Sequence, residues 1–172
     1  NYRVTFEDGK GEVIREEIIP VYVDANHKDP RQQLGQRVVQ GNSITGSPDT
    51  NRLQSLIQKQ DQLRAAADHY ISQQVESLRE TLTERRRRET QREIDDLADY
   101  AEAERQRIEQ FIEDYERKAE TGSDMDIAIR GQQERVKNLE NRIEDRREEL
   151  QRKAQVISLA PVVENLTFVL PV

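Results

Sequence analysis

A stretch of about 70 residues without glycine or proline, from Asp49 to Thr121, is the feature that most limits how this chain can fold. Glycine and proline are the residues that most often end helices, so their absence permits a single helix of about 100 Å at 1.5 Å per residue. Apolar residues recur in the stretch at steps of three and four, the spacing of one helix face. We therefore predict a long helix over residues 48–121, with Ser47 as N-cap and Pro48 at its first position.

The apolar face of this predicted helix falls into two parts. The first contains Leu53, Leu56, Leu63, Ala67, Tyr70, Ile71, Val75, Leu78 and Leu82, and the second Ile94, Leu97, Ala101, Ile108, Phe111, Ile112 and Tyr115. Residues 83–93 between the two parts carry no large apolar side chain. A kink, a solvated crossing and a binding patch are three open interpretations of that segment.

The rest of the helix surface is densely charged. The chain is 34% hydrophobic and 35% charged and has no tryptophan, which is little material for a compact core. Opposite charges stand four residues apart, a spacing that stabilises a helix by about 0.3 kcal/mol per pair. The pairs are Glu84 with Arg88, Glu113 with Arg117 and Asp114 with Lys118. This pattern favours a solvated helix over a disordered segment.

A hinge follows at Thr121-Gly122-Ser123. Glycine can close a helix in the left-handed conformation, and Ser123 with Asp126 resembles a capping box for the next helix. A return helix over 123–155 then matches the segment from about Gln91 to Glu120 in length. Its apolar residues are Ile129, Val136, Leu139, Ile143 and Leu150. We predict that the chain folds back here as an antiparallel coiled coil.

Both ends of the chain have strand character. Residues 1–23 predict a β-hairpin that turns at Asp8-Gly9, where glycine tolerates a positive φ, and Pro20 places the return strand at an edge or bulge. Residues 24–47 are a polar connector, and residues 156–172 predict a C-terminal strand that joins the hairpin. The predicted fold is mainly α, a long antiparallel coiled-coil arm inserted in a small antiparallel sheet of N- and C-terminal strands.

Two sets of residues are candidates for contacts. The first set is a group of arginines on the predicted helix: Arg85, Arg86, Arg88 and Arg92. They could bind phosphates of nucleic acid or a partner protein, although flanking glutamates favour a solvated, salt-bridged surface. The second set is an apolar seam that the return helix is too short to cover. A fold-back, the connector, a second copy of the chain and the remainder of a larger protein are its possible partners. The seam residues are Leu53, Leu56, Leu63, Tyr70, Leu78 and Leu82.

Catalytic and cofactor chemistry finds little support. The segment from Gly41 to Pro48 has the two glycines of a phosphate-binding loop but no lysine, which favours a flexible loop. There is no cysteine, His69 has no ligand-type neighbours, and the pair Asp95-Asp96 reads as a solvated helix face. We expect no catalytic residue, metal or cofactor in the chain itself.

The charge and hydropathy of the chain limit the partners and the cell compartment that we expect for the protein. The net charge of -7 implies no broad field for nucleic acid, and no apolar run approaches the roughly 20 residues that span a bilayer. We therefore expect a cytoplasmic protein without a membrane partner. Because the chain starts at Asn1 and its single methionine is Met125, we also expect it to be a fragment of a larger protein.

The order of these parts resembles the C-terminal accessory region of RapA-like ATPases, which are Swi/Snf-type helicases that include subunits of phage-defence systems. Three segments carry the resemblance: Glu17-Ile18-Ile19-Pro20-Val21-Tyr22-Val23, Asp124-Met125-Asp126-Ile127-Ala128-Ile129-Arg130 and Asn165-Leu166-Thr167-Phe168-Val169-Leu170-Pro171-Val172. The resemblance spans nearly the whole chain.

This resemblance implies that ATP binding and hydrolysis reside in upstream motor domains and that the chain is a non-catalytic accessory element. Its implied partners are those motor domains, nucleic acid and, as in the family's namesake, RNA polymerase. A stand-alone coiled-coil module for dimerisation or tethering is the alternative function. Sedimentation and DNA binding would separate the two hypotheses.

Overall fold

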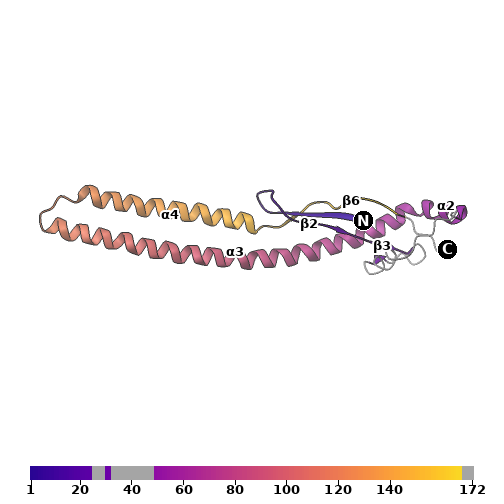
Figure 1. Ribbon diagram of the computed structural model, residues 1–172, viewed down its shortest axis with the longest axis horizontal. Helices are drawn as coiled ribbons and strands as arrows, with labels where there is room; N and C mark the ends of the chain where they lie inside the picture. Colours follow the sequence, from indigo (N-terminus) through magenta and orange to yellow (C-terminus); the bar gives the residue numbers. More distant parts are fainter. Residues whose placement is uncertain (25–29, 32–48, 168–172) are drawn as a thin grey trace. The chain divides into compact units, whose positions relative to one another are not determined.

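The computed structural model describes residues 1–24, 30–31 and 49–167 (Figure 1). The chain divides into two compact units. One unit, Asn1–Leu82 with Val156–Val172, contains the strands; the other, Thr83–Gln155, is helical. The predicted fold class is confirmed, since a long helix and a small antiparallel sheet of N- and C-terminal strands are both present. The predicted connector 24–47, apart from Asp24 and the short strand at 30–31, lies outside the described residues, as does the glycine-containing loop before Asp49.

The sheet is built around its first strand. β1 (Tyr2–Glu7) pairs antiparallel with β2 (Val13–Ile19), with Tyr2 opposite Ile19 and a bulge between Phe6 and Glu7. On its other edge β1 pairs antiparallel with β5 (Ile157–Ser158) and with β6 (Val162–Val163). Strands from both ends of the chain therefore share β1.

The predicted C-terminal strand is divided and begins earlier than its most apolar residues suggest. Pro161, which has no N–H to donate, lies between β5 and β6 and interrupts the pairing. Leu166 and Thr167 are in no strand, and residues 168–172 lie outside the described ranges. The contact with the hairpin is thus made by residues 157–163 rather than by the apolar segment that starts at Leu166.

The turn between β1 and β2 differs from the prediction in the glycine that it uses. Gly11 has the positive φ, 81°, and Gly9 is not in that conformation. The Asp8 side chain is 1% exposed, and its Oδ1 accepts hydrogen bonds from the backbone N–H groups of Lys10 and Glu12, at 2.8 and 3.0 Å. This carboxylate organises a longer turn than Asp8-Gly9 alone would make, so the left-handed residue falls two positions later.

Pro20 ends the second strand. β2 stops at Ile19, and the chain continues into β3 (Tyr22–Val23), which pairs antiparallel with β4 (Pro30–Arg31) in a separate two-stranded sheet. The residues expected as one return strand up to Val23 are therefore divided between two sheets. The missing N–H of proline explains the position of the break.

The long helical stretch begins two residues later than predicted. Asp49 is the N-cap of α2 (Thr50–Gln58), accepting hydrogen bonds from the backbone N–H groups of Asn51 and Arg52. The prediction of Ser47 as the cap is wrong, because the Asp49 carboxylate takes that role. α3 (Gln60–Glu120) follows after the single residue Lys59, whose N–H is shared between two carbonyls, those of Ser55 and Leu56.

The core of the strand unit lies between β1 and the first part of α3. Tyr2, Val4 and Phe6 alternate along β1 and point to one face, where they are 5%, 0% and 0% exposed. They form one buried cluster with a helix stripe spaced by four residues and with two further strand-region residues: Ala67, Ile71, Val75, Ile19 and Val156. β1 covers this cluster on one side and α3 on the other, and the burial of its apolar side chains stabilises the strand unit.

This core bears on the predicted apolar seam. The return helix was expected to be too short to cover Leu78 and Leu82, and both pack against the buried cluster of the sheet. The reason is that the strands from the two ends of the chain supply an apolar face, and an apolar helix stripe is the element that such a face packs against. The partner of Leu78 and Leu82 is therefore the sheet, which was not among the four expected candidates.

α3 ends at a well-defined hinge. Gly122 has φ 93°, and the N–H groups of Gly122 and Ser123 donate to the carbonyls of Ala119 and Lys118 at 2.9 and 3.2 Å. This is the Schellman arrangement, in which a left-handed glycine lets two orphan carbonyls of the last turn be satisfied. The prediction that Gly122 closes the helix in the left-handed conformation is confirmed.

The start of the return helix differs from the predicted capping box. α4 (Asp126–Ala154) has Met125 at its N-cap, without a side-chain hydrogen bond. Asp124 instead accepts a 3.4 Å hydrogen bond from the Asp126 N–H. The Ser123 N–H closes α3, and the N-cap of α4 lies two residues later than predicted.

Candidate interaction site on the helical hairpin

The helical hairpin is the pair formed by α4 and residues 83–120 of α3, which run side by side in opposite directions (Figure 1). Its seam contains the buried residues Ile108, Leu139 and Leu150. The large apolar side chains at the other seam positions are mostly half-buried, as two isolated helices can cover only part of each other's surface. The hairpin therefore carries a thin apolar centre inside a charged exterior.

Two contacts across the hairpin fix its register. The Arg86 guanidinium binds the backbone carbonyl of Lys153. A carboxylate oxygen of Glu104 lies 3.8 Å from a guanidinium nitrogen of Arg135. From 86 to 104 on α3 and from 153 to 135 on α4, both helices advance by the same 18 residues. The two helices therefore advance by the same length along the hairpin. This register shows which residues of α3 and α4 lie beside each other.

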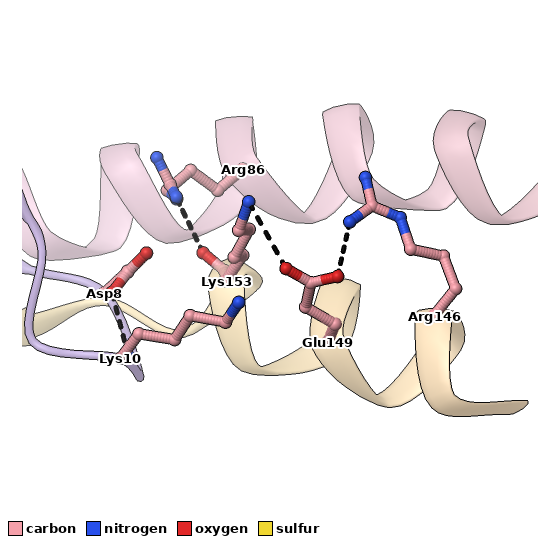
Figure 2. Close-up of polar contacts among 6 residues, drawn as sticks. All are labelled: Asp8, Lys10, Arg86, Arg146, Glu149 and Lys153. Carbon is pink, nitrogen blue, oxygen red and sulfur yellow. Dashed lines mark hydrogen bonds and ion pairs between the residues drawn. The ribbon is translucent and has the colours of Figure 1, made fainter. Parts of the chain in front are cut away.

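The open end of the hairpin is closed by an arginine. The Arg86 guanidinium donates two hydrogen bonds, of 2.9 and 2.8 Å, to the backbone carbonyl of Lys153 in the last turn of α4 (Figure 2). Carbonyls of a last turn have no partner within their own helix and carry the negative end of its dipole. Arg86 is therefore a cap for α4 supplied by the neighbouring helix.

A chain of ion pairs continues from this cap along α4. The Lys153 ammonium lies 3.7 Å from Glu149 Oε1, and the other oxygen of Glu149 is bound by Arg146 (Figure 2). These side chains are partly exposed, so each pair contributes little alone. Together they orient the last two turns of α4 beside the cap.

The remaining arginines of the predicted contact set lie on the exposed surface. Arg88 binds Glu84 at 2.9 Å, as predicted, and Arg85 binds Glu89 at 2.8 Å, a pair with the same four-residue spacing that was not named in advance. The hydrogen bond that the Arg85 guanidinium donates to the Glu89 carboxylate lowers the pKa of Glu89 and raises the pKa of Arg85. For Arg92, the described part of the chain shows no ion pair. α3 continues through this run without interruption.

The other predicted pairs on α3 have exchanged partners. Arg117 lies 3.4 Å from Asp114 rather than from Glu113, and the Lys118 ammonium lies over the ring of Tyr115, 5.7 Å from its centroid. Both alternatives use a spacing of three residues instead of four, and either spacing brings side chains together on a helix. The pattern of interspersed charges was predicted correctly, but not every partner was.

The predicted apolar seam residues belong to the strand unit and differ in their surroundings. Leu78 and Leu82 are held against the sheet, as described above, and Tyr70 is half-buried on α3. Leu53 and Leu56 of α2 and Leu63 of α3 are also half-buried. Within this set, only Leu53, Leu56 and Leu63 still resemble the predicted apolar seam.

The sequence did not reveal a groove on the side of the hairpin. It has a volume of about 380 Å³, and its residues come from both helices: Leu97, Tyr100, Leu139, Arg142, Ile143, Asp145, Arg146 and Glu149. Tyr100 is 55% exposed although it lies in the middle of the hairpin. An aromatic residue just outside the apolar repeat was the one signal in the sequence for this groove.

Other kinds of site find no basis in the described residues. Among residues 1–24, 30–31 and 49–167, no three histidine, cysteine, aspartate or glutamate side chains lie close enough to hold a metal ion. His69 contacts only Gln73, at 3.1 Å, in the hydrogen bonds of that part of the chain. No helix in the described ranges is long and apolar enough to cross a membrane.

Comparison with family models, with curated proteins and with solved structures finds no match to this chain.

Proposed function

We propose that this chain is a non-catalytic accessory element of an ATP-driven Swi/Snf-type helicase, and that its helical hairpin contacts a partner protein. The tie to such helicases rests on the resemblance of the three segments named above. It is supported by the arrangement of the parts, because a helical hairpin stands between N- and C-terminal strands that share one sheet. The motor domains of the parent protein are the first candidates for the partner.

The pairing of the arginine run favours protein over nucleic acid as the partner. Arg85 and Arg88 are neutralised by glutamates one turn away, and Arg86 is used to cap α4. Affinity for a nucleic-acid backbone comes from cations that replace its counterions, and paired cations contribute little to it. The net charge of -7 opposes binding further. This use of the arginines is the observation that carries the proposal.

Assays of ATP hydrolysis and of DNA binding with the purified 172-residue chain test this proposal. We expect no ATP turnover above background, with or without double-stranded DNA, and only weak DNA binding that Arg88→Gln and Arg92→Gln leave nearly unchanged. Measurable turnover would overturn the non-catalytic role. Tight, salt-sensitive binding that is lost in the two variants would make nucleic acid the partner instead.

A structural tether is the second candidate function, and α2 is the feature that favours it. Ile57 is 52% exposed beside the half-buried Leu53 and Leu56, so this short helix retains an apolar surface. In that function this apolar seam on α2 would join two copies of the chain. A dimer in sedimentation that is abolished by Leu56→Asp together with Ile57→Asp would favour it, and an unaffected dimer would exclude this seam.

A further inference from the structure

The groove on the hairpin continues as an apolar stripe along one face. Tyr100 and Phe111 are 55% and 39% exposed, and 11 residues separate them. Since 11 residues make about three turns, the two rings lie on the same face of α3. We call this the groove face, defined by Tyr100, Phe111, Arg142 and Arg146. Exposed aromatic rings in line with a groove are typical of interaction surfaces.

The two helices of the groove face carry opposite charge at the same level. Residues 93–104 of α3 contain no basic residue and six acidic ones: Glu93, Asp95, Asp96, Asp99, Glu102 and Glu104. By the register of the hairpin, residues 135–146 of α4 lie beside them. That segment has four basic and three acidic residues, and two of the bases, Arg142 and Arg146, line the groove.

Two carboxylates on the acidic side of the groove face, Glu93 and Asp96, have no ion pair in the described part of the hairpin. Glu93 and Asp96 lie seven and four residues before Tyr100, a spacing that places them on its face of α3. In the described part of the chain, neither has an ion pair, and the same holds for Arg142. The face therefore presents unpaired charges of both signs on either side of an apolar groove.

We infer that the groove face binds a second copy of this chain, hairpin against hairpin, in a four-helix bundle. A two-fold axis parallel to the helices places α3 of one copy over α4 of the other at the same level. Glu93 then meets Arg146 of the other copy, and Asp96 meets its Arg142. Each ionic contact occurs twice by symmetry, which is how a self-complementary face forms a closed dimer.

The apolar stripe fits the same arrangement. Phe111 stands level with the start of α4, where Ile127 is 80% exposed and Gly131 has open space at the position of its missing Cβ. The ring of one copy can therefore lie over the glycine of the other beside an exposed isoleucine. A two-fold axis across the helices would instead stack acidic α3 on acidic α3, so charge selects the first arrangement.

The inference does not depend on the proposed tie to a helicase. Sedimentation velocity of the full 172-residue chain over a wide concentration range tests it, with Asp96→Arg, with Arg142→Asp and with both together. We expect a reversible wild-type dimer, at least a tenfold weaker dimer in each single variant because two equivalent contacts are lost, and recovery in the double variant. Circular dichroism verifies that helicity is retained.

Two further variants make the result specific. Asp95→Arg reverses a neighbouring carboxylate that points about 100° further round the helix, and it should leave the dimer unchanged. Tyr100→Ser, which adds no charge, should weaken the dimer like the single reversals. A wild-type chain that stays monomeric at every concentration would overturn the inference. So would an equal effect of Asp95→Arg, or a double variant no better than the single ones.

Discussion

The strand unit and the helical hairpin are stabilised in opposite ways although α3 is common to both. In the strand unit, a few apolar residues from β1 and α3 are removed from water almost completely, and Val4 and Phe6 are 0% exposed. In the hairpin, most seam residues stay half-exposed, while short-range ion pairs and the Arg86 cap add many small contributions. One sequence thus uses burial at one end of a helix and surface charge at the other.

Phe6→Ala should have the largest effect and should fall on the strand unit. Removing a fully buried phenylalanine costs about 3–5 kcal/mol, because a cavity forms in the core. We expect hydrogen exchange to accelerate most in β1, β2 and residues 67–75 of α3. Comparable acceleration around Leu139 would mean that the two units are not stabilised separately.

Ile108→Ala makes the corresponding change in the hairpin. Ile108 is 2% exposed and is the most buried hairpin residue among those described. We expect a loss of about 2 kcal/mol, the lower end of the range for such truncations, since half-exposed neighbours can collapse into the space. Exchange should accelerate in the hairpin and not in β1. A loss equal to that of Phe6→Ala would contradict the contrast.

Arg86→Met should separate the capping arginine from the surface arginines. It removes two charge-assisted hydrogen bonds to the Lys153 carbonyl, and we expect a loss of about 1–2 kcal/mol with fraying of the last turn of α4. Arg88→Met is the matched control, with an expected loss of about 0.3–0.5 kcal/mol, because it breaks only an exposed pair. Equal losses in chemical denaturation would refute the capping role.

Tyr2→Phe should have a small effect that depends on pH. The buried Tyr2 hydroxyl donates a 2.6 Å hydrogen bond to Asp68, and burial together with that carboxylate raises the pKa of Tyr2 far above its usual value. This hydrogen bond therefore contributes about 1 kcal/mol to the free energy of unfolding at neutral pH. The contribution is lost above about pH 10, because the tyrosine ionises first in the unfolded chain. Denaturation curves of variant and wild type should converge as the pH rises through that range.

The sequence predicted the elements with a strong local signal and missed those that depend on distant residues. The absence of glycine and proline, the repeat of apolar residues and Gly122 sufficed for the two long helices and their hinge. The caps were placed wrongly because aspartate accepts the same N–H groups as serine, and Asp49 and Asp124 are the acceptors at the starts of α2 and α4. The packing of Leu78 and Leu82 on the sheet depends on strands nearly 80 residues away on either side, which no local pattern encodes.

The candidate site shows the same limit. The pairing of Arg88 with Glu84 follows from spacing, but the role of Arg86 depends on where α4 ends relative to α3. The groove around Tyr100 likewise depends on the register of the two helices. Side chains on one helix are predictable from their period, whereas contacts between helices require the hinge geometry.

The equal advance of the two helices between the Glu104–Arg135 and Arg86–Lys153 contacts couples the length of α3 to the length of α4. An insertion of a few residues in α3 alone would carry Arg86 past the end of α4 and leave both the cap and the seam out of step. An insertion of the same number of residues in each helix, in whole turns, would keep every contact and only lengthen the reach. Change in length, by evolution or by engineering, is therefore expected to come in matched pairs on either side of Gly122.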